Sequence, residues 1–192
     1  GAGLAGPVMA KYLSDHGYFI DIYERRPDMR VVKQSAGRSI NLALSARGIE
    51  ALKNIGIFGE IQPSLLPMKG RMIHDMDGKT HLQPYGQKED EVIYSVSRAF
   101  LNKNLMDLVE RTGNVKIHFD HSLENIDINN SELIFKNNKK ISFNRVMGSD
   151  GSSSCIRKCI NERSSMNFRK IPLGHGYKEL SIPATKNGDF KL

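Results

Sequence analysis

The feature that most constrains this chain is the glycine-rich stretch GAGLAG at its beginning, where Gly1, Gly3 and Gly6 have the spacing G-x-G-x-x-G. A loop of this kind cradles a pyrophosphate only where it joins a strand to a helix. Residues 4–16 have the pattern of that helix, with Pro7 tolerated in its first turn. Because no residues precede Gly1 to form the strand, we expect the chain to be a piece of a longer protein.

An acidic residue follows the loop at a spacing typical of dinucleotide-binding domains. Residues 19–24 alternate as a strand does and end at Glu24, 18 residues after Gly6. A carboxylate there can accept a hydrogen bond from the ribose 2′-hydroxyl of the adenosine and repels a 2′-phosphate. The motif therefore predicts bound FAD or NAD rather than NADP, with a glycine-rich turn and a surface glutamate as the alternative.

The remaining patterns predict an α/β chain. Residues 46–55 and 99–112 have helical patterns, with Ser45 and Ser97 as the expected N-caps. Residues 68–97 have a β pattern that turns at DMDG, residues 75–78. Further strands are expected at 115–119, 123–128, 132–136, 140–143 and before GSDG, then a helix over 152–160 and a β-like tail over 175–184. Alternation of strand and helix followed by an antiparallel insert favours a nucleotide-binding fold with a β excursion.

A second glycine motif, GSDGSSSCIR at residues 148–157, is expected to close a strand and open a helix. Here the chain resembles the flavoprotein aromatic hydroxylases, in which such a stretch lies against the FAD pyrophosphate. YERRPDMR, GRSINLALSARG, PMKGRMIHD, QPYG, YSVSR and HGYKEL extend the resemblance over almost the whole sequence. It implies a Rossmann-like FAD-binding domain (1–67 and 97–170, first strand missing) with a β-sheet substrate-side excursion (68–96 and 171–192), truncated at both ends.

The resemblance also implies an activity and a set of ligands. The activity is hydroxylation of L-kynurenine to 3-hydroxy-L-kynurenine with bound FAD, NADPH as co-substrate and O₂. The cofactor carries the chemistry, so no catalytic side chain and no metal site are expected. The implied FAD ligands are Gly1, Gly3, Leu4, Ala5 and Gly6 at the pyrophosphate, Glu24 and Arg25 at the adenosine, Leu44 and Arg98 on the flavin side, Leu123 at the adenine, and Asp150 in the second motif. The implied ligands of the substrate carboxylate are Arg71 and Tyr85.

Two other functions remain open. One is a related FAD hydroxylase with another aromatic substrate, although Arg71 and Tyr85 favour an amino-acid carboxylate over a simple phenol. The other is a non-catalytic nucleotide-binding scaffold, which needs Glu24 and Asp150 but neither Arg71 nor Tyr85. Those two residues could instead be a surface salt-bridge arginine and a core tyrosine.

Charge and composition argue against a nucleic-acid-binding protein and against a membrane-spanning segment within these residues. The net charge of +7 comes from scattered basic residues that are not interleaved with aromatics, so we expect a solvated surface and no nucleic-acid partner. No apolar run approaches the roughly 20 residues of a membrane span. The expected location is cytoplasmic, or the mitochondrial outer membrane if an anchor follows residue 192. Cys155 and Cys159 should share a helix face, whereas His118 and His121 should point to opposite faces of a strand.

Overall fold

The computed structural model describes residues 1–32, 41–164, 168–176 and 183–188. Its helices are α1 (Ala5–Asp15), α2 (Ala46–Asn54), α3 (Phe58–Ile61), α4 (Arg98–Glu110) and α5 (Cys155–Arg163), with a 3₁₀ helix η1 (Gln62–Ser64). Its strands are β1 (Ile20–Tyr23), β2 (Asn41–Leu44), β3 (Leu66–Met68), β4 (Gly70–His74), β5 (Thr80–Pro84), β6 (Ile93–Ser97), β7 (Val115–His118), β8 (Leu123–Asp127), β9 (Glu132–Phe135) and β10 (Lys140–Ser142). No helix among the described residues is both long and apolar enough to cross a membrane.

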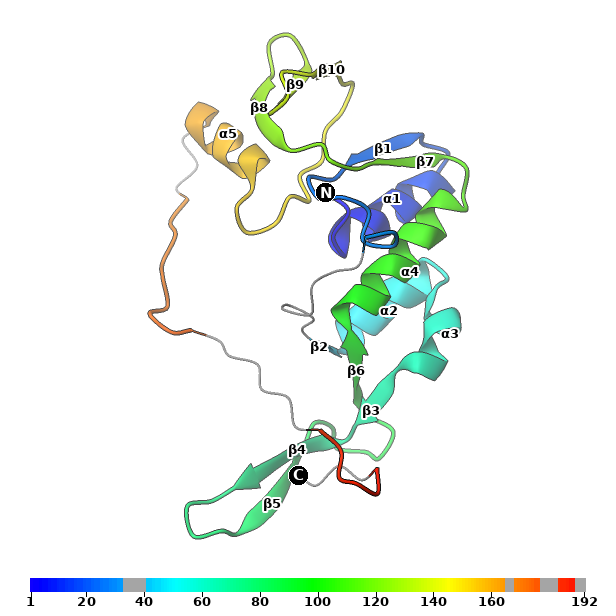
Figure 1. The fold of residues 1–192 in the computed structure, drawn as a ribbon, viewed down its shortest axis with the longest axis vertical. Helices are drawn as coiled ribbons and strands as arrows, with labels where there is room; N and C mark the ends of the chain where they lie inside the picture. Colours follow the sequence, from blue (N-terminus) through cyan, green and yellow to red (C-terminus); the bar gives the residue numbers. More distant parts are fainter. Residues whose placement is uncertain (33–40, 165–167, 177–182, 189–192) are drawn as a thin grey trace.

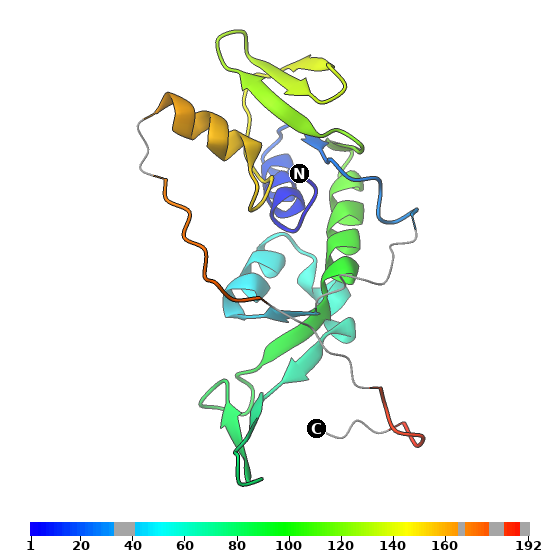
Figure 2. The same ribbon diagram turned by 60° about the vertical axis from the view of Figure 1, so that its left-hand side comes forward.

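These elements follow one another along an elongated molecule (Figures 1 and 2). The β4–β5 hairpin lies at one end, followed by the antiparallel sheet β2-β6-β3 with helices α2 and α3. The parallel pair β1–β7 comes next with helices α1 and α4, and the antiparallel sheet β8-β9-β10 with α5 lies at the far end. The α/β class with a β excursion is therefore confirmed.

Helix α4 lies in the middle of the molecule because it carries apolar residues on two sides. Leu101, Leu105 and Leu108 pack into a cluster with α2, α3 and the β2-β6-β3 sheet. Met106 and Val109 pack instead against α1, β1 and β7. The Ser97 hydroxyl accepts a hydrogen bond from the Phe100 backbone N–H at 3.4 Å, which confirms the predicted cap.

The third cluster joins α5 to the β8-β9-β10 sheet, and both cysteines belong to it. The Cys155 thiol donates to the Glu124 carbonyl at 3.2 Å and the Cys159 thiol to Asn125 Oδ1 at 3.4 Å. Burial, with a smaller contribution from Cys159, raises the pKa of the Cys155 thiol to about 11. Both cysteines are packing residues on one helix face, as predicted.

Local predictions differ from the structure in several places. Ser45 is the N-cap of α2 as predicted, but its side chain makes no capping hydrogen bond. Residues 144–150, expected to contain a strand, lie in neither a helix nor a strand, because no described strand pairs with them. Helix α3, η1 and β3 were missed, since each is too short to show a period. Residues 177–182 of the expected β-like tail lie outside the described residues.

The two histidines of β7 and the following loop also differ from the prediction. The strand ends at His118, and Asp120 has a positive φ of 57°, which turns the chain back. As a result the His118 and His121 ring centroids are 5.9 Å apart, and both rings contact Tyr23. They fasten the β8-β9-β10 sheet to the parallel pair instead of facing opposite ways.

Candidate functional site

The two glycine motifs, far apart in sequence, meet at the N-terminal end of α1. The Ser149 hydroxyl donates to the Gly1 carbonyl at 3.0 Å. A Cβ on Gly1 would lie 2.8 Å from the Ser149 carbonyl oxygen, and one on Gly6 would lie 2.0 Å from the Gly1 carbonyl oxygen. Glycine is therefore required at both positions, because backbone approaches backbone more closely than any side chain allows.

Gly3 occupies the opposite, open side of this loop. A Cβ added to Gly3 would meet no atom within 4 Å. Helix α1 begins two residues later, with Leu4 as an N-cap that provides no side-chain hydrogen bond and with no acidic residue in the first turn. The first N–H groups of α1 and the positive end of its dipole are thus free of side-chain caps, as an anion-binding helix terminus requires.

Glu24 lies directly after β1 and is 6% exposed. Its carboxylate accepts hydrogen bonds from the Ala2 N–H at 2.8 Å, the Arg26 N–H at 3.0 Å and the Arg26 Nε at 2.8 Å. Burial acts to raise the pKa of Glu24, but the hydrogen bonds from Arg26 and Ala2 together outweigh it, so the pKa is lowered. Glu24 is consequently a buried carboxylate that stays charged and holds the glycine loop.

Asn102 of α4 contacts the same loop residue from the other side. Its Nδ2 donates to the Ala2 carbonyl at 3.1 Å and to Met29 Sδ at 3.1 Å. Asn102 is 6% exposed and Ala2 is 1% exposed, so both lie inside the protein. Asn102 was not predicted as a site residue, although a polar residue among the apolar positions of a helix was a signal in the sequence.

The segment after Glu24 is fixed to α4 by Arg30. Its guanidinium pairs with Asp28 at 2.7 Å, Asp107 at 2.8 Å and Glu110 at 2.5 Å, and lies 5.7 Å from the centre of the Phe119 ring. Hydrogen bonds to Asp28, then to Glu110 and Asp107, raise the pKa of Arg30 despite partial burial. This pairing holds residues 24–30 in place beside the glycine loop.

Asp150, in the second motif, organises the start of α5. Its carboxylate accepts from the Ser154 hydroxyl at 2.5 Å and from the Ile156 N–H at 3.1 Å. A cavity of about 400 Å³ opens beside it, lined in part by Gly148, Arg157 and Phe168. Arg157 lies over the Phe168 ring at 4.9 Å, which attaches the chain beyond α5 to this cavity.

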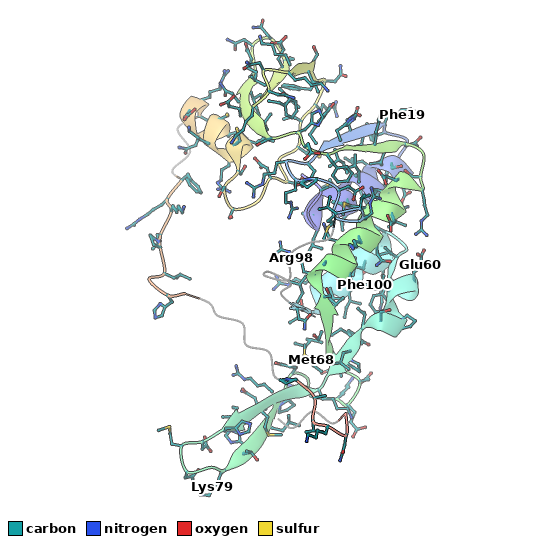
Figure 3. All side chains as sticks on the ribbon, viewed as in Figure 1. Phe19, Glu60, Met68, Lys79, Arg98 and Phe100 are labelled. Atoms are coloured by element: carbon teal, nitrogen blue, oxygen red, sulfur yellow. The ribbon has the colours of Figure 1, made fainter. Side chains whose placement is uncertain are left out.

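The other residues predicted to bind the cofactor lie on several different elements. Arg25 is exposed, and its neighbour Arg26 makes the pair with Glu24 that the sequence analysis did not foresee. Leu44 ends β2 with its side chain in the hydrophobic core, and Leu123 is the first residue of β8. Arg98 is the first residue of α4, at its junction with β6 (Figure 3).

The predicted substrate residues share one face of the β4–β5 hairpin. Arg71 is paired with Gln83, to which its Nε donates at 2.7 Å, and the Tyr85 N–H donates to the Lys69 carbonyl at 2.9 Å. In this antiparallel register Arg71 and Tyr85 are diagonal neighbours on the same face. The turn at Asp75–Gly78 confirms the predicted hairpin, with Gly78 at a φ of +83°.

Comparison with known proteins gives this geometry a context. No family model matches the chain. Curated relatives named kynurenine 3-monooxygenase come from Legionella pneumophila (strain Corby, 41% identical over 95% of this chain), Myxococcus xanthus (40%, 100%) and Anopheles gambiae (38%, 100%). The chain is thus similar in sequence to the kynurenine 3-monooxygenases over nearly all of its own length. It spans 41%, 42% and 40%, respectively, of the length of these relatives.

Solved structures share the fold at lower identity. A tetrameric 2-methyl-3-hydroxypyridine-5-carboxylic acid oxygenase has a TM-score of 0.66 and is 18% identical, covering 83% of this chain and 40% of that one. The flavin-dependent monooxygenase PieE, solved with FAD and substrate, has a TM-score of 0.66 at 17% identity, with coverage of 84% and 31%. The resemblance to kynurenine 3-monooxygenases and to the fold of flavin monooxygenases is thereby confirmed.

Proposed function

We propose that this chain forms the FAD-binding part of a monooxygenase that hydroxylates L-kynurenine to 3-hydroxy-L-kynurenine with NADPH and O₂. The observation that carries the proposal is the contact of GAGLAG with GSDG through Ser149 and Gly1, together with the buried Glu24 that binds Ala2 of the first motif. Relatives named kynurenine 3-monooxygenase, similar over almost the whole chain, support the substrate and the reaction. Solved flavin monooxygenases of the same fold support FAD as the cofactor.

The residues present fit the pyrophosphate of FAD. The open side of Gly3 lets a phosphate approach the backbone, and the uncapped start of α1 offers N–H donors without a competing acid. Gly1 and Gly6 pack the loop against Ser149, which gives the donors a fixed position. The main chain from Gly1 to Gly6 would then hold the diphosphate, and the Leu4 and Ala5 side chains need not touch it.

Glu24 can meet the adenosine ribose while still holding the loop. An ionised carboxylate has about four lone-pair positions, and the three hydrogen bonds to Glu24 leave one for a ribose 2′-hydroxyl. The same negative charge repels a 2′-phosphate, so NADPH would bind elsewhere and only transiently. We place Arg25 at the rim of this adenosine site, since its side chain is exposed.

The bound flavin would supply hydride acceptance and oxygen activation, which protein side chains cannot provide. The protein's part is to hold the substrate ring beside it. We assign residues 68–96 to the substrate side, with Arg71 forming a bidentate pair with the kynurenine carboxylate and Tyr85 adding a further hydrogen bond. Arg98, between the hairpin and the glycine loop in Figure 3, would lie toward the flavin.

Substitution of Arg71 tests the substrate half of the proposal. In the full-length protein, Arg71→Ala should leave the kynurenine carboxylate buried and unpaired, at a cost of about 2–5 kcal/mol. At 1.4 kcal/mol per decade this raises the kynurenine dissociation constant about 30-fold to several thousand-fold, with FAD content unchanged. Arg71→Lys should recover only part of the affinity, because an ammonium cannot form the two-pronged pair.

The matched control is Lys79→Ala, which removes an exposed cation from the same hairpin. It should bind kynurenine as the unsubstituted protein does in a titration followed by flavin fluorescence. Unchanged kynurenine affinity in Arg71→Ala would contradict the carboxylate assignment and favour a different aromatic substrate.

A further inference from the structure

In the buried side chain of Asn102, the amide nitrogen makes hydrogen bonds and the amide oxygen makes none within the described part of the chain. Its Oδ1 is inaccessible to solvent and has no hydrogen-bond partner among the described residues. An unpaired carbonyl inside a protein costs free energy, and a leucine of similar size at this position of α4 would avoid that cost. An amide at this position therefore has to be explained by what its nitrogen does.

The nitrogen completes a two-sided hold on Ala2. The Ala2 N–H is held by Glu24 at 2.8 Å, and the Ala2 carbonyl is held by Asn102 at 3.1 Å. The same Nδ2 also contacts Met29 Sδ at 3.1 Å, in the segment that Arg30 fixes to α4. The orientations of the Ala2 N–H and of the Ala2 carbonyl are thus each fixed by a hydrogen bond.

That direction matters for the next residue. The Ala2 carbonyl and the Gly3 N–H belong to the same peptide unit, which is planar and trans, so the two groups point in opposite directions. With the carbonyl turned toward α4, the Gly3 N–H is turned away from α4. Nothing lies within 4 Å of the Cβ position of Gly3, so the loop is not packed against other residues there and leaves space for a ligand.

We propose that Asn102 is a positioning residue of the cofactor site, which orients the Gly3 N–H toward the anion by holding the Ala2 carbonyl. The inference rests on the proposed function, in which this loop binds the FAD pyrophosphate. Asn102 itself does not touch the cofactor, and its contribution passes through one peptide unit.

The test is an FAD titration of the full-length apoprotein and its variants, followed by flavin fluorescence. Asn102→Leu keeps the volume and removes the donor, and should weaken FAD binding about tenfold to a hundredfold. Asn104→Asp is the matched control on the same helix. Its Nδ2 bonds the Phe100 carbonyl at 2.9 Å, and residues two apart on a helix do not share a face. The control should bind FAD within about twofold of the unsubstituted protein, a difference of only a few tenths of a kcal/mol.

Asn102→Asp gives a readout that a merely structural role would not move. A carboxylate at position 102 cannot donate to the Ala2 carbonyl, and it is repelled by the Glu24 carboxylate, which binds the same loop residue. The adjacent segment also carries the cations Arg26, paired with Glu24, and Arg30, paired with Asp28, Asp107 and Glu110. A protonated carboxyl can donate, and burial near a negative charge raises the pKa of such a group. The ratio of FAD dissociation constants, variant over unsubstituted protein, should therefore fall as pH is lowered from about 8 to about 5.5.

The FAD dissociation constant of the variant is divided by that of the unsubstituted protein at each pH. This ratio cancels the pH dependence that both proteins share through the titration of FAD and of Glu24. The readout is the change of this ratio with pH for the single variant Asn102→Asp. A uniformly lower thermal stability of that variant would not produce such a change. FAD binding by Asn102→Leu within twofold of the unsubstituted protein, or a pH-independent ratio for Asn102→Asp, would overturn the inference. An unsubstituted full-length protein that binds no FAD would overturn the proposed function itself, and the inference with it.

Discussion

Glu24 is a buried carboxylate that holds the glycine loop, and we propose that it also binds the adenosine ribose. Its spacing to Gly6 predicts the ribose contact from the sequence alone. The structure adds that its oxygens are already engaged by Ala2 and Arg26, at 2.8–3.0 Å. Because these bonds keep the buried group ionised, Glu24 is charged whether or not a ribose is present.

Removing Glu24 should accordingly weaken FAD retention in the full-length protein. Glu24→Ala loses the ribose partner and releases the Ala2 N–H, for an expected loss of about 1–3 kcal/mol in FAD binding. Glu24→Gln should lose less, since one acceptor oxygen remains. The control is Glu60→Ala, which removes an exposed partner of Arg111. Equal FAD occupancy and off-rate in Glu24→Ala and the unsubstituted protein would show that the ribose assignment is wrong.

At the scale of elements, the loop between Gly1 and α1 has one side fixed by packing and one side open. Gly6→Ala places a Cβ 2.0 Å from the Gly1 carbonyl, so it should lower both the melting temperature of the apoprotein and its FAD affinity. A Cβ on Gly3 meets no protein atom within 4 Å, so Gly3→Ala should leave the melting temperature unchanged. The same Cβ would occupy the space through which a phosphate approaches the backbone, so the variant should have a lower FAD affinity. Calorimetry of both apoproteins with FAD titrations checks this, and equal melting temperatures for the two variants would contradict it.

The elements that sequence predicted correctly are those specified by neighbouring residues. The Ser97 cap, the DMDG turn and the shared face of Cys155 and Cys159 each depend on a few adjacent positions. The strand expected before GSDG failed because a strand needs a partner, and none of the described strands pairs there.

The candidate site divides in the same way. The glycine spacing and Glu24 are visible in the sequence, because these residues lie at fixed offsets from one another along the chain. Ser149 and Asn102 are not, because each contacts a loop residue that is at least 100 positions away in the sequence. Arg26 lies only two positions from Glu24, and the sequence pattern does not distinguish it from Arg25 as the partner of that carboxylate. The prediction that His118 and His121 point to opposite faces was wrong because Asp120 has a positive φ, which no residue pattern indicated. Both rings therefore contact Tyr23.

At the scale of the whole molecule, the described sheets are small and much apolar surface is exposed. Strand β1 pairs only with β7 among the described strands. Phe19, Leu66, Ile171 and Leu173 are each at least 66% exposed. We therefore expect the 192-residue chain alone to bind FAD poorly and to give a poorly dispersed amide NMR spectrum. Sharp amide dispersion with stoichiometric FAD on the isolated chain would contradict this expectation.

The proposed function requires that the two glycine motifs hold FAD for hydroxylation of kynurenine. The most direct test purifies the full-length protein, measures its flavin content, and incubates it with NADPH, O₂ and L-kynurenine. We expect stoichiometric FAD, oxidation of NADPH that depends on kynurenine, and 3-hydroxy-L-kynurenine identified by mass spectrometry. A protein without flavin, or one that carries FAD yet hydroxylates a simple phenol and leaves kynurenine unchanged, would contradict it.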